Sequence, residues 1–332
     1  MSVDPVREVA QAVLYEGYLL WPYRRSALKN RHRWTLGGIL PRAYSQARGG
    51  DDPYRLRTEC LLEAAAGDPL RVTLRFLHVV TRDVARYRDG VLEPVPELVV
   101  AGQRHLAWEE ATEREVRVAV PALRGLRDRP YRRRLQIPAG GHTEPLGDPP
   151  AGAVVRRWQA LRGQVEVRAA RCGDNLYRVG VEVVNTTACP RADRSAAMER
   201  SFVSAHVVLH CPPGRFVSLM DPPPALRDEA QRCRNTGVWP VLAGPDGDRS
   251  TVLAAPIILY DHPRVAPESP GDLFDATEVD QLLTLSILGL TEQEQQEMRD
   301  SDPRAREILD RCAALTPEQL MRLHGTLREV VR

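Results

Sequence analysis

From about residue 55 to residue 260 the chain alternates apolar and polar side chains with a period of two, the pattern of half-buried β-strands. In the stretch 71–76, Val, Leu and Phe at even positions alternate with Arg and Thr at odd ones. The apolar residues of 165–167 and 177–183 flank the turn sequence Cys172-Gly-Asp-Asn, which predicts a β-hairpin. A further strand is predicted at 202–210, with Phe202, Ser204, His206, Val208 and His210 on one face.

About ten short strands separated by Gly and Pro turns favour an antiparallel sandwich or barrel. Strands and helices do not alternate along the chain, which argues against a doubly wound parallel sheet. Residues 138–152 are rich in Gly and Pro and are predicted to form a surface loop or linker. Such a linker could divide the strands into two sheets or two subdomains.

Helical patterns occupy the two ends of the chain. Asp4 caps and Pro5 opens a first helix whose apolar face includes Val6, Val9 and Val13. Capping signals predict about four short helices in the tail; they are Asp275 with Glu278, Thr291 with Glu294, Asp302-Pro303, and Thr316-Pro317.

The predicted fold is therefore α+β and mainly β: an antiparallel β-sandwich-like body with an N-terminal helix and arm and a C-terminal helical tail. We expect an N-terminal helix and aromatic, basic arm at 1–50, the β-rich body at 51–260, divided near 138–152 if that linker separates two subdomains, and an acidic loop with the helical tail at 261–332.

The composition is that of a globular protein: 332 residues, 43% hydrophobic and 27% charged, with a net charge of +2. No apolar run approaches the roughly 20 residues that span a bilayer, so no membrane insertion is expected. The first residues carry no secretory signal, which predicts a cytoplasmic protein. The six cysteines include no Cys-x-x-Cys pair and are expected to be small thiols without disulfides.

Charge is segregated along the chain. Residues 17–50 contain seven bases and no acid, whereas residues 261–302 contain eleven acids and two bases. This asymmetry indicates either an external partner or docking of the two segments on each other, and we favour internal docking. The near-neutral balance argues against a nucleic-acid partner.

No P-loop, dinucleotide-binding, zincin or α/β-hydrolase motif occurs. His206 and His210 are four residues apart on a predicted strand, which separates them by about 13 Å along its axis. Two histidines at that distance cannot share a metal ion, so no metal site and no cofactor are predicted.

Two segments carry candidate function. The first is the acidic loop, in which Asp261, His262, Glu268 and Asp272 could bind a divalent cation or perform acid–base chemistry. The alternative is a solvated or docking loop. The second is the arm at 15–34, where aromatic and basic residues could pack on the sheet, bind a protein partner or stack on bases. Its candidate partner-binding residues are Tyr18, Trp21, Tyr23, Arg24, Arg25 and Trp34.

Four stretches carry a resemblance: Glu16–Asn30, Arg215–Pro223, Pro256–Asp280 and Leu315–Gly325. They resemble a group of uncharacterised actinobacterial proteins encoded alongside high-affinity, oxygen-tolerant [NiFe]-hydrogenases. The resemblance implies an accessory role in making or supporting a hydrogenase and assigns no activity to a residue.

The predicted function is accordingly a cytosolic accessory or scaffold protein that binds another protein, with a hydrogenase subunit as the implied partner. The competing hypothesis is a metal-assisted hydrolase that uses the acidic loop at 261–280. We further hypothesise that the basic arm and the acidic loop lie close together and form one composite face.

Overall fold

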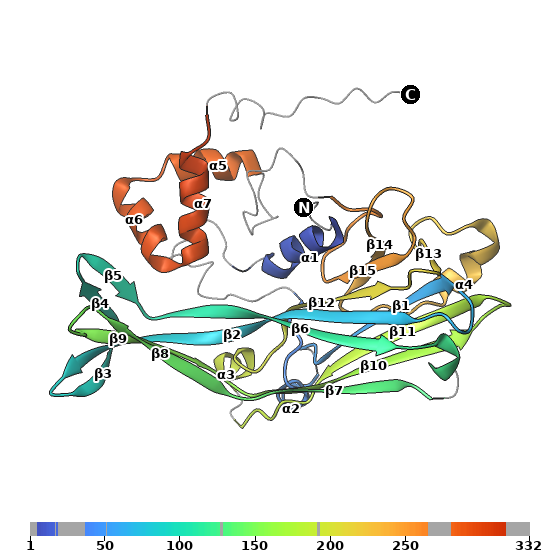
Figure 1. Cartoon of the computed structure of the whole chain (residues 1–332), viewed down its shortest axis with the longest axis horizontal. Helices are drawn as coiled ribbons and strands as arrows, with labels where there is room; N and C mark the ends of the chain where they lie inside the picture. Colours follow the sequence, from blue (N-terminus) through green and yellow to red (C-terminus); the bar gives the residue numbers. More distant parts are fainter. Residues whose placement is uncertain are drawn as a thin grey trace.

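A computed structural model describes residues 5–16, 18, 37–50, 52–126, 129–190, 193–264 and 280–316. Its body consists of two antiparallel β-sheets, with helices at both ends of the chain (Figure 1). The predicted mainly β, sandwich-like α+β fold is confirmed.

The first sheet has five strands in the order β13-β1-β11-β10-β7. Their bounds are β13 (Arg215–Val217), β1 (Arg55–Glu63), β11 (Leu176–Asn185), β10 (Leu161–Arg171) and β7 (Tyr131–Ile137). The predicted hairpin is confirmed as β10 and β11, which pair from Gly163 opposite Asn185 to Arg171 opposite Tyr177.

The second sheet has eight strands. Six follow the order β14 (Trp239–Leu242), β15 (Thr251–Ala255), β12 (Val203–His210), β2 (Leu70–Arg88), β9 (Gly152–Trp158) and β8 (Gly140–Leu146). Two more, β3 (Val91–Val95) and β6 (Trp108–Val120), pair with β2. A separate ribbon joins β4 (Glu97–Val100) to β5 (Gln103–Leu106).

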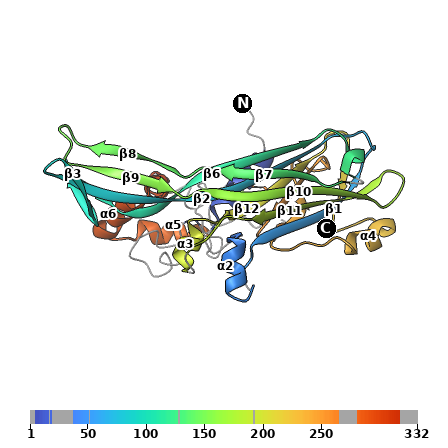
Figure 2. The ribbon, with the colours of Figure 1, turned by 90° about the horizontal axis from the view of Figure 1, so that it is seen from below.

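The 19-residue strand β2 runs through the whole second sheet. Its first half pairs with β6 and β12, and its second half pairs with β9 and β3. Only the first half is backed by the five-stranded sheet; the second half projects beyond it with β3, β8 and β9 (Figures 1 and 2). We call this projecting part, together with the β4–β5 ribbon, the wing.

The prediction of a loop at 138–152 is wrong, because these residues form β8, a turn and the start of β9. Glycine and proline are tolerated here since β8 is an edge strand, and its side chains are exposed apart from Leu146.

The predicted common face of residues 202–210 is also wrong at its first member. A β-bulge interrupts the pairing of β12 with β2 between Val203 and His206, and Ser204 adopts a positive φ of 51°. The extra residue places Phe202 in the core between the sheets with Ala205 and Val207, and its ring centroid lies 4.8 Å from that of Phe76. The side chains of Ser204 and His206 lie on the opposite face of the sheet, where the Ser204 hydroxyl donates to the Val13 carbonyl of the first helix.

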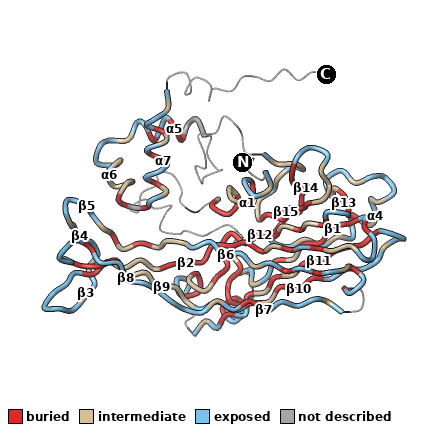
Figure 3. Tube along the Cα trace, viewed as in Figure 1, coloured by how far each residue is buried: buried red, intermediate tan, exposed pale blue. Residues whose placement is uncertain are grey.

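Helices cover the face of the eight-stranded sheet that points away from the five-stranded sheet. The first helix, α1 (Pro5–Tyr15), packs Val9, Ala10 and Val13 on β14 and β15. Three tail helices, α5 (Asp280–Leu288), α6 (Glu292–Ser301) and α7 (Pro303–Ala313), bury Ile287, Met298 and Ile308 with Leu77 of β2. Buried residues lie both between the two sheets and between the eight-stranded sheet and these helices (Figure 3).

Two of the predicted tail caps are confirmed. Thr291 and Glu294 form a reciprocal capping box on α6, and Asp302 accepts a hydrogen bond from the Arg304 backbone at the start of α7. The Asp275 and Thr316 caps involve positions outside the described residues. The other short helices within the described residues are α2 (Arg42–Ala47), α3 (Arg194–Met198), α4 (Arg227–Gln231), η2 (Leu123–Leu126) and η3 (Pro224–Leu226).

All six cysteines are free thiols, and Cys60, Cys211 and Cys312 are buried. Among the described residues, no helix is both long and apolar enough to cross a membrane.

Candidate interaction site

Asp261 and His262 lie at the end of a segment that returns along strand β14. Ala255, the last residue of β15, is paired with Trp239, whereas the His262 backbone N–H donates to the carbonyl of Leu242 at 2.7 Å. The chain from 256 to 262 therefore runs back along the strand, and we call it the strap. One carboxylate oxygen of Asp261 accepts the Leu242 backbone N–H at 2.8 Å.

The second carboxylate oxygen of Asp261 accepts a hydrogen bond from the Ser218 hydroxyl. The Ser218 oxygen in turn accepts the backbone N–H groups of Met220 and Asp221, at 3.1 and 3.0 Å. Both oxygens of Asp261 are thus engaged by protein donors that hold the strap and the 218–221 turn together. His262 has a positive φ of 56°, and its Nδ1 lies 3.3 Å from the Gly244 carbonyl oxygen.

The predicted catalytic group is only partly visible, because Glu268 and Asp272 lie outside the described residues. Within the described part of the chain, no three His, Cys, Asp or Glu side chains are arranged to hold a metal ion. His206 and His210 have separate polar contacts: His206 Nδ1 lies 3.0 Å from the Ser204 carbonyl oxygen, and His210 Nδ1 lies 3.0 Å from Thr251 Oγ1.

The strap presents large apolar side chains to solvent. Ile257 and Leu259 pack inward against the cluster under α1, so Ile258 and Tyr260 point outward and are 76% and 81% exposed. Trp239, opposite Ala255, is 45% exposed, and Met220, in the turn tied to Asp261, is 48% exposed. We call these four residues, Met220, Trp239, Ile258 and Tyr260, the apolar patch.

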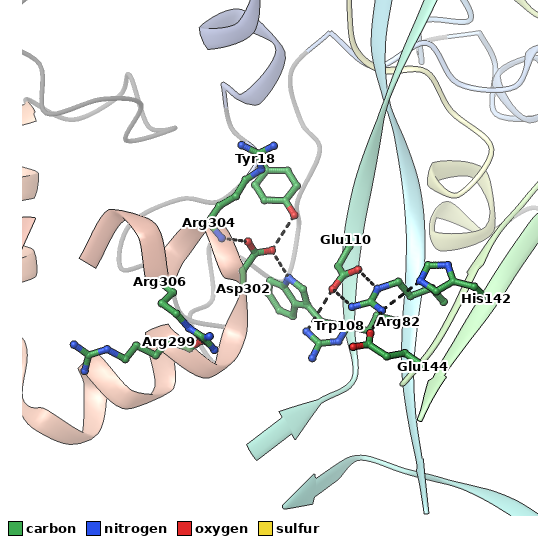
Figure 4. Close-up of polar contacts among 11 residues, drawn as sticks. Tyr18, Arg82, Trp108, Glu110, His142, Glu144, Arg299, Asp302, Arg304 and Arg306 are labelled. Carbon is green, nitrogen blue, oxygen red and sulfur yellow. Dashed lines mark hydrogen bonds and ion pairs between the residues drawn. The ribbon is translucent and has the colours of Figure 1, made fainter. Parts of the chain in front are cut away.

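Tyr18, the one described residue among the predicted arm contacts, is buried at the junction of the two chain ends (Figure 4). Its hydroxyl donates to Asp302 at 2.8 Å, and the indole N–H of Trp108 donates to the same oxygen at 3.2 Å. The other predicted arm residues, Trp21, Tyr23, Arg24, Arg25 and Trp34, lie outside the described residues, as does the proposed composite face with the acidic loop.

A polar cluster surrounds this junction beneath α1. The Tyr15 hydroxyl donates to Glu113 at 2.7 Å, and the Arg304 guanidinium lies 3.5 Å from the Tyr15 ring centroid. Burial raises the pKa of Tyr15. Burial alone would also raise the pKa of Glu113, but hydrogen bonds from Tyr15 and Gln11 and the charge of Arg75 hold it below its usual value.

An ion-pair network lies beside this junction on the wing. Glu110 contacts Arg82 at 3.4 Å and Arg156 at 2.7 Å, and Arg156 also contacts Glu144 at 2.7 Å. Figure 4 shows this network next to Trp108 and Asp302. Its members come from β2, β6, β8 and β9, so no local spacing in the sequence signals it. All four charges are matched within the network, which therefore braces the strands.

Comparison of the chain with protein-family models and with curated protein sequences finds no match. The geometry thus defines a strand-rich platform whose chain ends are joined by buried polar contacts and whose strap carries exposed aromatic and aliphatic side chains.

Proposed function

We propose that the protein is an accessory or scaffold protein that acts by binding another protein. The observation that carries this proposal is the apolar patch, whose four large side chains are 45–81% exposed on segments tied to one another through Asp261. Tyr and Trp are frequent anchors of protein interfaces. Exposed groups of large apolar side chains commonly mark such sites.

The way the patch is held supports the same conclusion. Backbone and carboxylate hydrogen bonds at Leu242 order the strap before any partner arrives. A pre-ordered surface binds with a smaller loss of conformational entropy. The use of both Asp261 oxygens as acceptors further supports a structural role for this residue over a catalytic one.

The resemblance to proteins encoded alongside [NiFe]-hydrogenases makes a hydrogenase subunit the partner to test, in the cytoplasm. Trp21, Tyr23, Arg24, Arg25 and Trp34 of the predicted arm contacts belong to this proposal as additional binding residues, whereas Tyr18 is buried and does not.

The test is affinity capture of the tagged full chain from a lysate that contains the hydrogenase, followed by mass spectrometry for its subunits. We expect Ile258→Ser with Tyr260→Ser to abolish enrichment of the hydrogenase subunits. The matched control is Val91→Ser with Val99→Ser, because these wing residues are 62% and 60% exposed and lie outside the patch. Equal enrichment by the two double variants, or none by the wild type, would contradict the proposal.

A further inference from the structure

The chain closes several edges of its own sheets. On the outer side of β14, the strap forms hydrogen bonds with the backbone N–H and C=O of Leu242. On β13, the Phe216 N–H donates to the Arg249 carbonyl at 2.6 Å. The edge strand β8 contains Pro145, which cannot donate to an added strand. Among the residues that the structure describes, one side of β6 is also unpaired, but its charges are engaged, as in the contacts of Glu113 with Tyr15 and Arg75.

Strand β7 differs from these edges. It is the last strand of the five-stranded sheet and, among the described residues, pairs only with β10, through all seven of its positions. Its other side therefore offers a row of backbone N–H and C=O groups that another strand can use.

The β7 edge also carries unneutralised positive charge. Arg132, Arg133 and Arg134 are consecutive and exposed. Arg132 contacts Glu166, which also binds Arg168. Arg133 and Arg134 form no ion pair with any residue that the structure describes. Alternation along the strand places Arg133 on one face of the sheet and Arg132 with Arg134 on the other, so an added strand would meet arginine on both faces.

We propose that β7 is the docking edge for an extended acidic segment of a protein partner, which adds to the five-stranded sheet as one further strand. Opposite charges across neighbouring strands favour this pairing. A second copy of β7 would instead place arginine opposite arginine, which opposes self-association. A nucleic acid could contact the guanidinium groups, but it would leave the strand's backbone donors and acceptors unused, so the acidic strand is the occupant that the edge fits better.

The test measures fluorescence anisotropy of a labelled seven-residue peptide of alternating Glu and Val, added to the full chain. We expect saturable binding that weakens as salt is raised. Arg133→Glu with Arg134→Glu should weaken this binding by about tenfold or more. The matched control is Arg86→Glu with Arg215→Glu, which makes the same change in net charge at exposed arginines away from β7 and should bind like the wild type.

Two further probes separate the occupants. The same peptide with every backbone nitrogen methylated keeps its charge but cannot donate along either edge of a strand, and should not bind. The proposal is overturned if the methylated peptide binds equally well, if the Glu–Val peptide does not bind, or if an oligothymidylate binds more tightly and displaces it. It is also overturned if sedimentation shows a dimer that Arg133→Glu with Arg134→Glu dissociates.

This inference rests on the protein-binding function proposed above but uses a different surface. If the wild type captures the hydrogenase subunits but does not bind the Glu–Val peptide, only the β7 proposal fails. If it binds the peptide but captures no subunit, only the proposed hydrogenase partnership fails.

Discussion

The phenol of Tyr18 donates a hydrogen bond to the carboxylate of Asp302 over 2.8 Å, and so joins residues 284 positions apart in the chain. The same oxygen accepts the Trp108 indole N–H, and the other oxygen accepts the Arg304 backbone N–H at 2.8 Å. Asp302 is 1% exposed. A single buried carboxylate therefore holds the N-terminal segment, the eight-stranded sheet and helix α7 together.

Removal of this carboxylate should destabilise the protein strongly. Asp302→Ala deletes the cap of α7 and removes the acceptor of two buried donors, so we expect the free energy of unfolding to fall by about 3 kcal/mol. Tyr18→Phe removes one hydrogen bond and should cost about 1 kcal/mol. Urea denaturation measures both.

The control for this pair is Tyr87→Phe, because Tyr87 is 39% exposed. We expect its unfolding midpoint to match that of the wild type. A double variant of Tyr18 and Asp302 that shows strictly additive losses would argue against direct coupling of the two side chains.

Two buried histidines predict acid sensitivity. Burial lowers the pKa of His206 to about 4, and burial with the nearby charge of Arg114 lowers the pKa of His78 to about 4, from an ordinary value of 6.5. Well above pH 6.5 both imidazoles are neutral in the folded and unfolded states. As the pH falls from 6.5 to about 4, the unfolded chain binds protons first, so stability declines by about 3 kcal/mol for each histidine.

His206→Gln should flatten this decline, because one proton-binding site is removed from the unfolded state. His142→Gln, at an exposed position, should leave the decline unchanged. Chemical denaturation at several pH values between 4 and 7 measures the slope. If the slopes of His206→Gln and the wild type agree over this range, protonation of His206 is not the cause.

Asp261 tests the two interpretations of the acidic loop. Asp261→Ala removes the acceptor for the Leu242 N–H and the Ser218 hydroxyl, and should lower the free energy of unfolding by about 2 kcal/mol. The structural role predicts the same loss with and without a chelator or added divalent cations. A cation that stabilises the wild type but not Asp261→Ala would instead support the metal-assisted hydrolase hypothesis.

Gly163 tests the packing between the sheets. A Cβ at this position would lie 2.8 Å from both Phe202 Cζ and the Val184 carbonyl oxygen, so Gly163→Ala forces the core to shift. We expect a loss of about 1–3 kcal/mol in the free energy of unfolding. Gly125→Ala is the matched control, because a Cβ there meets no atom within 4 Å, and a loss of similar size in both variants would exclude this cause.

The elements that sequence reasoning identified are those with a local signal. The β10–β11 hairpin follows from alternation on both sides of a turn, and the α6 capping box follows from Thr291 and Glu294. The β-bulge at Ser204 has no such signal, because a positive φ is typical of glycine and a serine in the sequence does not indicate one. Alternation of apolar and polar residues also does not indicate which strands pair with each other. The pairing of the long strand β2 with four other strands therefore could not be predicted from it.

The candidate site shows the same division. Sequence analysis selected Tyr18 and Asp261 as candidate site residues, but it did not predict the hydrogen bonds that each of them forms within the fold. Asp302 accepts from residues 194 and 284 positions away, and the Asp261 carboxylate bonds to Ser218, 43 positions earlier. The apolar patch is equally hidden, since only the folded strap sends Ile258 outward while Ile257 packs inward.

Strand β2 gives its first half to the layered body and its second half to the wing. Breaking the backbone between residues 70 and 88 would therefore deprive each region of a strand that its neighbours require. Neither region can be produced as an intact fragment without the other. Force that a partner applies at the end of the wing would therefore pass along β2 into the part of the sheet on which α1 and Tyr18 pack.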